Sequence, residues 1–450
     1  MMQVAHDGQA DTQRVMVARA DAAFPWYIGG AFAVAVAGGF MLAVLLPLAV
    51  VLEWDWGVRW RALTQAHGHL QIAGWLGLFI AGMSLRLAPR FAGRPLPFPA
   101  MTAPALLLLL FGVLGRALAQ PWIEDPAMQG IVLVSALAEL AGAALIALLL
   151  IVTLAPAARR LAPAPFLMLG AVGMVTQALL GALWLPDLTA DQPYIAAARN
   201  NALLGIQFYA FVLPFVLGVS LRALPVFFAR PAPSARTAWI VAIVLGAGAA
   251  VYAGGAIALD GTTGVRLEGA GAGMIALAIV AVLAQTGTWR QPERLRTSAR
   301  HAALLIRTAS AWLALVALAL LLTGIRSMVA GTPVSPGDTD AIRHVLAIGV
   351  FTTLLAGMAY LMLPWLAMRR IKPATPRRET FSLWALLSVA TVLRAGGALL
   401  EGSGAGAGRY WPMAVGGVLA LSAVGFLASI VARAARPQST EIVLHERSTR

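Results

Sequence analysis

The sequence predicts an all-α, polytopic membrane protein with about twelve transmembrane helices. Of its 450 residues, 60% are hydrophobic and 12% are charged, whereas soluble globular proteins carry roughly a quarter charged residues. The apolar runs are about 20 residues long, which is the length that a helix needs to cross a bilayer. They lack the strict alternation of a transmembrane β-strand. A sequence repeat recurs every four spans. It predicts three four-helix units that are related by pseudo-threefold symmetry.

Twelve apolar segments account for most of the chain. Proline and glycine mark most of the connections between them. We expect spans at about Tyr27–Leu52, Ala66–Leu87, Ala103–Gln120, Ile131–Leu154, Phe166–Leu185, Ala202–Leu224, Thr237–Leu259, Gly269–Gln285, Ala302–Ile325, Ile342–Leu366, Phe381–Leu400 and Trp411–Val431. Together they form one transmembrane domain over residues 25–434, between tails at residues 1–24 and 435–450.

Charged residues alternate between the two sides of the predicted membrane. Even-numbered loops are basic, as at Arg159 and Arg160, and odd-numbered loops are mixed or acidic, as at Glu124. By the positive-inside rule both termini are cytoplasmic, so we expect a bacterial inner-membrane protein surrounded by lipid. The net charge of +14 is spread over short loops, and we expect no nucleic-acid partner. The chain has no cysteine, which excludes disulfides and thiolate metal sites.

Three similar segments recur at fixed intervals. They are Gly82–Pro89 (GMSLRLAP), Gly218–Pro225 (GVSLRALP) and Gly357–Pro364 (GMAYLMLP), at offsets of 136 and 275. Spans rich in Ala, Gly and Leu can match by chance, but here Gly and Pro also agree in order. We therefore predict repeats over about residues 25–160, 161–297 and 298–434. In this alignment Arg116, Tyr252 and Arg394 occupy equivalent positions.

Three of the six histidines lie at the predicted outer ends of spans. His67 and His69 open the second span, His344 opens the tenth, and the repeat aligns His69 with both His344 and Gly205. Ionisable residues are rare inside membranes and mark functional sites there. Because two neutral imidazoles from facing helices can bind a haem iron from both sides, we predict His69 and His344 as an axial pair.

The remaining histidines have other expected roles. His67 lies about 200° around the helix from His69, so the two rings cannot face one site. We expect His67 to be a second metal or haem ligand, or a hydrogen-bonded structural histidine. His6, His301 and His445 are expected at solvated surface positions.

Several further residues share the predicted outer level of the histidines. The arginines at this level are Arg59, Arg61, Arg116, Arg343 and Arg394. We expect them to bind the anionic haem propionates, although each alone is also explained as an interfacial arginine. Gly74, Gly77 and Gly349 either leave room for a flat macrocycle or serve helix packing. Glu139, within a span, either moves protons or pairs with an arginine.

The twelve spans, the three four-helix arcs and the histidines of the second and tenth spans resemble subunit I of the haem-copper oxidases. The resemblance implies a low-spin haem, of b type, between His69 and His344. The copper-site histidines of that superfamily are missing. The sixth span reads Gly205-Ile-Gln-Phe-Tyr209, residues 225–265 contain no histidine, and residue 342 is Ile. We therefore expect no terminal oxidase and leave enzymatic activity open.

A closer resemblance is to the NnrS family, which comprises haem- and copper-containing membrane proteins linked to the nitric oxide response. It rests on His67-Gly68-His69, on Arg343-His344-Val345-Leu346 and on Phe208-Tyr209-Ala210-Phe211-Val212. The resemblance implies a haem, copper as a second metal, and nitric oxide as the diatomic ligand. It also implies His67, His69 and His344 as metal ligands.

Two other functions stay open at this point. One is a degenerate oxidase or nitric oxide reductase subunit that is active with a partner. The other is a transporter, without haem, for a small polar or metal substrate. Its polar site would comprise His67, His69, Gln71, Gln207 and Tyr209.

Overall fold

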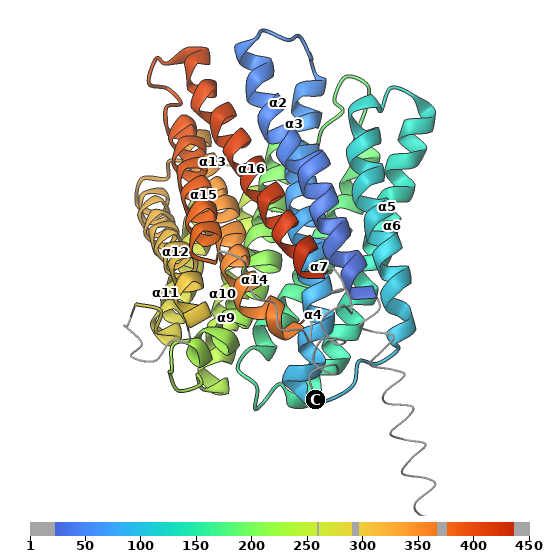
Figure 1. Cartoon of the computed structure of the whole chain (residues 1–450). Helices are drawn as coiled ribbons and strands as arrows, with labels where there is room; N and C mark the ends of the chain where they lie inside the picture. The colour runs from blue at the N-terminus through green and yellow to red at the C-terminus, as the bar shows by residue number, and fades with distance from the viewer. Residues whose placement is uncertain (1–22, 259–260, 290–296, 367–375, 436–450) are drawn as a thin grey trace, which may run out of the picture.

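A computed structural model describes residues 23–258, 261–289, 297–366 and 376–435 of the chain (Figure 1). Within these ranges the chain is helical and contains no strand. The predicted tails, which carry His6 and His445, lie outside the described residues except for residues 23, 24 and 435.

Twelve helical spans long and apolar enough to cross a membrane confirm the predicted fold class. The first six are Ala23–Val51, Arg59–Ala92, Pro99–Trp122, Pro126–Ala157, Ala164–Asp187 and Ala197–Phe227. They contain α2 (Phe40–Val51), α3 (Arg59–His69), α4 (Gly77–Ala92), α5 (Thr102–Ala119), α6 (Pro126–Leu154), α7 (Ala164–Trp184), α8 (Ala197–Gly205) and α9 (Leu213–Phe227).

The last six spans are Ala235–Ile257, Gly261–Thr286, Arg300–Ala330, Pro336–Leu361, Arg377–Leu399 and Gly406–Ala434. They contain α10 (Ala235–Ala258), α11 (Gly261–Thr286), α12 (Thr297–Ala330), α13 (Pro336–His344), α14 (Thr353–Leu366), α15 (Pro376–Leu399) and α16 (Tyr410–Ala435). Each predicted span overlaps one of these twelve helices.

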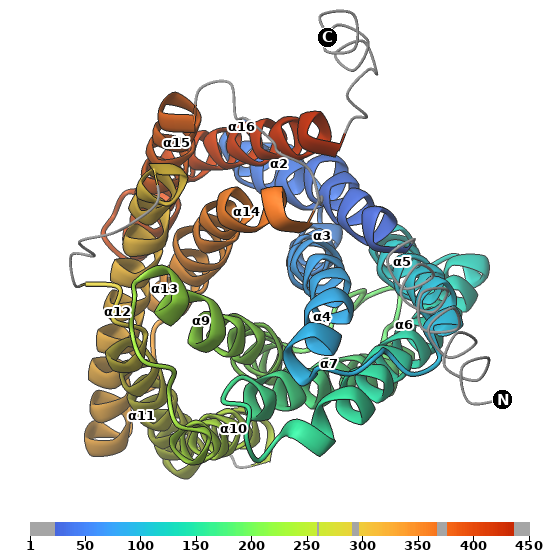
Figure 2. The same cartoon turned by 60° about the horizontal axis from the view of Figure 1, so that its bottom comes forward.

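The second, sixth and tenth spans form the inside of the bundle (Figure 2). The other nine surround them as a ring, which is closed where α16 packs against α2. Of the apolar windows of the inner spans, 72%, 83% and 56% of the residues are buried, against 33–50% for the ring. The three inner helices are equivalent members of the three predicted units.

Each inner helix contains a π-helical stretch at the position that the repeat predicts. The stretches are Leu70–Leu76, Ile206–Val212 and Val345–Thr352. Their starting residues differ by the same 136 and 275 positions as the sequence repeat. Because π-helical turns are rare and often mark functional sites, their recurrence supports both the repeat and a special role for the inner helices.

The inner helices begin earlier than the sequence predicted. The second span starts at Arg59 rather than Ala66, and the tenth at Pro336 rather than Ile342. The predicted starts were too late because they followed hydrophobicity alone, whereas polar turns extend both helices beyond their apolar parts. At the tenth span, Pro336 occupies the first turn and Ser335 caps it by accepting a hydrogen bond from the Asp338 N–H at 3.0 Å.

Candidate functional site

Two adjoining cavities lie between the inner helices and the first, eleventh and twelfth spans. The first has a volume of about 210 Å³ and the second about 200 Å³. Five residues line both cavities, namely Ala43, Thr64, His67, Asp340 and Arg394. His344 lines only the first cavity, and Trp60 and Arg409 line only the second. The cavities lie towards the end of the bundle where α2 connects to α3, which is the upper end in Figure 1.

His67, near the end of α3, has a defined tautomer. Its Nδ1 lies 2.8 Å from the carbonyl oxygen of Gly39 in the first span. A carbonyl oxygen can only accept, so Nδ1 carries the proton and donates it. The Nε2 of a neutral ring then keeps its lone pair, and in the described part of the chain no protein group binds it. His67 therefore presents a free metal-binding nitrogen at the wall of both cavities.

His344, at the end of α13, is oriented in the same way by a residue of its own helix. Its Nδ1 lies 2.8 Å from the backbone oxygen of Asp340 and 3.1 Å from the Oδ1 of that residue. Both partners are acceptors, so Nδ1 again carries the proton and Nε2 keeps its lone pair. No described residue hydrogen-bonds to this Nε2. His67 and His344 line the same cavity.

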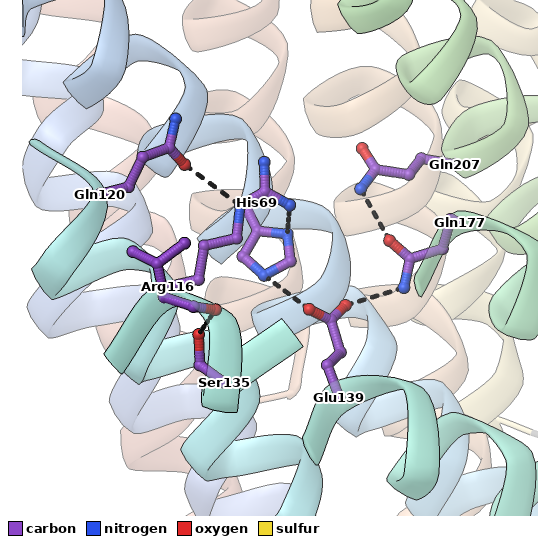
Figure 3. A network of polar contacts seen from close by, with 8 residues as sticks. His69, Arg116, Gln120, Ser135, Glu139, Gln177 and Gln207 are labelled. Carbon is purple, nitrogen blue, oxygen red and sulfur yellow. Dashed lines mark hydrogen bonds and ion pairs between the residues drawn. The ribbon is translucent and has the colours of Figure 1, made fainter. Parts of the chain in front are cut away.

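His69 differs from these two histidines because both of its ring nitrogens are used within the protein (Figure 3). Nδ1 lies 3.3 Å from an N–H group of Arg116, which can only donate, and Nε2 lies 3.2 Å from Oε2 of Glu139. The neutral ring therefore accepts at Nδ1 and carries its proton at Nε2, whose contact with Glu139 has an ion-pair distance but not the geometry of a hydrogen bond. The structure directs His69 towards α5 and α6 and His67 towards the first span, so the expected divergence of the two rings is present.

A buried polar network extends from His69 to both sides (Figure 3). Gln177 donates to Oε1 of Glu139 at 2.8 Å, and Gln207 donates to Gln177 at 2.9 Å. On the other side, Arg116 donates to Oε1 of Gln120 at 3.2 Å. These side chains come from the second to the sixth spans and are almost wholly buried. Their mutual hydrogen bonds join the inner helix to the ring.

The five arginines predicted to bind propionates fall into two groups. Arg116, Arg343 and Arg394 line the first cavity, and Arg394 also lines the second. Arg116 is engaged with His69, and Arg343 donates to Asn201. The remaining two arginines line neither cavity.

Arg59 and Arg61 lie at the upper surface instead. Arg59 pairs with Glu124 and stacks over Trp122 at 4.3 Å, while Arg61 donates to the hydroxyl of Tyr194 at 3.1 Å. The pKa of Glu124 is lowered, first by a backbone hydrogen bond and then by the hydrogen bond from Arg59. Both arginines thus have surface partners of their own.

Two buried donors at the second cavity have no hydrogen-bond partner among the described residues. They are Nε of Arg394 and Nε1 of Trp60. Nε1 of Trp75, which lines the first cavity, has none either. A buried donor without an acceptor costs free energy, so such atoms indicate a polar group that is not part of the protein. Neither Trp60 nor Asp340 was predicted as a site residue. For Asp340 the sequence held a signal, since a carboxylate four residues before a histidine lies on the same helix face.

The second unit fills the place of its missing histidine with an aromatic side chain. Gly205 aligns with His69 and His344, and a Cβ atom there would lie 2.8 Å from Cδ1 of Tyr252. The ring of Tyr252 also packs edge to face on Tyr209, with centroids 5.5 Å apart. Of the predicted polar pocket, Gln71 and Gln207 line the first cavity, whereas Tyr209 packs against Tyr252. The second unit therefore contributes no histidine to a cavity, whereas the first unit contributes His67 and the third contributes His344.

The described residues contain no group of three or more His, Cys, Asp or Glu side chains that could hold a metal ion. Among the described residues, His67 and His344 are the two imidazoles that offer a free Nε2 to a cavity. Two imidazoles suit a metal that already has other ligands, such as the iron of a macrocycle.

Comparisons with known proteins support the fold. A structure of a heme-copper terminal oxidase dimer solved by cryo-EM is similar to this chain, with a TM-score of 0.61 and 12% sequence identity. The match covers 95% of this chain and 84% of that chain. No protein-family model and no curated protein sequence matches. The chain therefore has a haem-copper oxidase-like, multi-pass membrane fold.

Proposed function

We propose that this protein is a membrane haem protein of NnrS type, in which His67 and His344 bind the iron of a b-type haem as an axial pair. The observation that carries the proposal is the tautomer of these two rings. Each uses Nδ1 to donate to the protein and leaves the Nε2 lone pair free at a shared cavity. Hydrogen-bonded Nδ1 groups are the usual arrangement for metal-ligating histidines. The pair replaces His69 by His67 but joins the same two inner helices that the sequence indicated.

The surroundings of the two histidines also fit a haem. Apolar side chains, such as Phe40, Leu204 and Ile348, form part of the wall of the first cavity and suit a macrocycle, while polar and charged side chains form the rest. The second cavity holds the unpartnered Nε of Arg394 and Nε1 of Trp60. Haem propionates are carboxylates that would accept from these donors. We therefore propose that residues of the first cavity would hold the macrocycle and that Arg394 and Trp60 would be donors to its propionates.

A haem supplies an iron that changes oxidation state and binds diatomic gases. The chain's own residues fix the two imidazoles, exclude water with apolar walls and neutralise the propionates. Linkage to nitric oxide is proposed on the resemblance of His67-Gly68-His69 and Arg343-His344-Val345-Leu346 to NnrS segments. Copper is proposed on the same resemblance, and the described residues add no third ligand for it. The positive-inside rule supports a site near the outer face of a bacterial inner membrane, with both termini cytoplasmic.

Difference spectra of the purified protein, dithionite-reduced minus oxidised, test the haem site. We expect sharp α and β bands of a low-spin haem in the wild type and their loss in His67→Ala and in His344→Ala. His69→Ala is the matched control, because it lies two residues from His67 on the same helix and has no free nitrogen. Bands that persist in His67→Ala but vanish in His69→Ala would instead assign the ligand role to His69.

Transport without haem is the second candidate function. The observation that favours it is the buried network of His69, Glu139, Gln177 and Gln207 next to the first cavity, since polar groups at membrane depth often line substrate paths. A flat difference spectrum from folded protein produced in haem-replete cells would reject the haem proposal. The transport function would then be tested by comparing substrate uptake by the wild type and by Gln207→Leu, which alters this network.

A further inference from the structure

The two proposed axial histidines are held by unequal partners. His67 donates from Nδ1 to a neutral backbone carbonyl, that of Gly39. His344 donates from Nδ1 to the backbone carbonyl of Asp340 at 2.8 Å, and in addition the carboxylate of that residue lies 3.1 Å from the same nitrogen. A carboxylate acceptor makes an imidazole a more basic and stronger ligand than a carbonyl acceptor does. The bond from His344 to a metal is therefore the stronger of the two.

Asp340 is itself fixed in place. Its Oδ2 accepts from Arg394 at 3.3 Å, while Oδ1 faces His344. The residue also lies in α13, whose first turn is capped by Ser335. The carboxylate thus bridges an imidazole and a guanidinium from two different spans, which keeps the His344 ring in one orientation.

The two histidines also differ in the cavities that they touch. The second cavity, of about 200 Å³, touches His67 but not His344. The residue after His67 is Gly68. A Cβ atom added to Gly68 would lie 3.9 Å from its nearest neighbour, which is Cδ2 of Leu204. The ring of His67 is thus held at Nδ1 by one contact, whereas Nδ1 of His344 has both the backbone oxygen and the carboxylate of Asp340 as partners.

We infer that His344 is the retained axial ligand, that Asp340 is the positioning residue that makes it so, and that His67 is the ligand displaced when a neutral diatomic gas binds. The inference rests on the proposed function. In such an exchange the gas would replace Nε2 of His67 on the ferrous iron, so that one coordination bond would form for the one that breaks. The oxidation state of the iron does not change and no proton is transferred.

Resonance Raman spectroscopy of the purified, full-length, dithionite-reduced protein tests the inference with carbon monoxide as the probe. After photolysis of bound carbon monoxide, the iron–histidine stretch reports the ligand that stayed on the iron. We expect Asp340→Asn to lower this frequency, because an amide is a weaker acceptor than a carboxylate. Glu139→Gln changes a partner of His69 and Gln177 but none of His344, so it is the matched control and should leave the frequency unchanged.

His67→Gly provides a second test that does not depend on Asp340. If His344 is the retained ligand, this variant keeps the wild-type iron–histidine frequency. Its carbon monoxide association is at least about tenfold faster, since no ligand has to leave first. The inference would be overturned if haem-loaded Asp340→Asn kept the wild-type iron–histidine frequency. It would also be overturned if the iron–histidine band disappeared in haem-loaded His67→Gly. Absence of haem from the wild type would instead refute the proposed function.

Discussion

Nε2 of His69 lies 3.2 Å from Oε2 of Glu139, and both residues are at least 95% buried. The pair joins the inner helix of the first unit to α6 of the surrounding ring. Arg116 and Gln177 supply its remaining hydrogen bonds. A charged group at this depth is tolerated only when it is paired, so this contact is part of the architecture rather than an open ligand site.

Glu139→Ala should destabilise the protein strongly without removing the histidine site. Breaking a buried ion pair by deleting one partner costs about 3–5 kcal/mol, because the other partner is left uncompensated. We expect a lower apparent melting temperature in detergent and, in the folded fraction, a haem spectrum like that of the wild type. Glu124→Ala is the control, since this surface carboxylate pairs with the exposed Arg59 and its loss should leave the melting temperature unchanged.

The fold was predictable from the sequence because its signals are periodic. Apolar length defined the spans, and the recurrence of the Gly-to-Pro segments at offsets of 136 and 275 defined the three units. The same offsets recur in the π-helical stretches of the inner helices. Helix starts were predicted late because polar interfacial turns continue a helix without adding hydrophobicity.

The choice between His67 and His69 was not predictable from spacing. Helical geometry shows that the two rings diverge, but it does not show which of them meets acceptors and which meets a donor. That depends on Gly39 and Arg116, which are far from the histidines in sequence and come next to them only in the folded bundle. The unpartnered Nε1 of Trp60 is likewise visible only once its neighbours are placed.

Gly205→Ala should destabilise the second unit. The added Cβ would lie 2.8 Å from the ring of Tyr252, which is itself packed against Tyr209, so something must shift. Overpacking of this kind costs about 1–3 kcal/mol. Gly273→Ala is a matched control in a neighbouring helix, because nothing lies within 4 Å of its built Cβ. Thermal unfolding should separate the two variants, and the double variant Gly205→Ala/Tyr252→Leu should recover much of the lost stability. Equal melting temperatures for both single variants would contradict the packing argument.

Arg394→Leu should weaken haem retention. The side chain offers an unpartnered Nε to the second cavity, and a hydrogen bond to a charged group contributes about 1.5–3 kcal/mol, which corresponds to roughly 10–150-fold in haem affinity. The measurement is the rate of haem transfer to an excess of an apo-globin acceptor. Arg59→Leu serves as the control, since Arg59 lines neither cavity and pairs with Glu124. Equal transfer rates for the two variants would remove Arg394 from the proposed propionate site.

Ser335→Ala should affect haem retention through the helix that carries His344. Ser335 caps α13, and loss of such a cap costs about 0.5–2 kcal/mol. The first turns of this helix hold Asp340, so fraying there loosens the contact that orients the Nδ1 of His344. Asp125→Ala removes the comparable cap of α6, where the acceptor binds the Ala127 N–H at 2.8 Å, far from the histidine cavity. We expect similar losses of thermal stability in both variants but faster haem transfer only in Ser335→Ala. Faster transfer in both variants would mean that haem loss follows global stability rather than the orientation of His344.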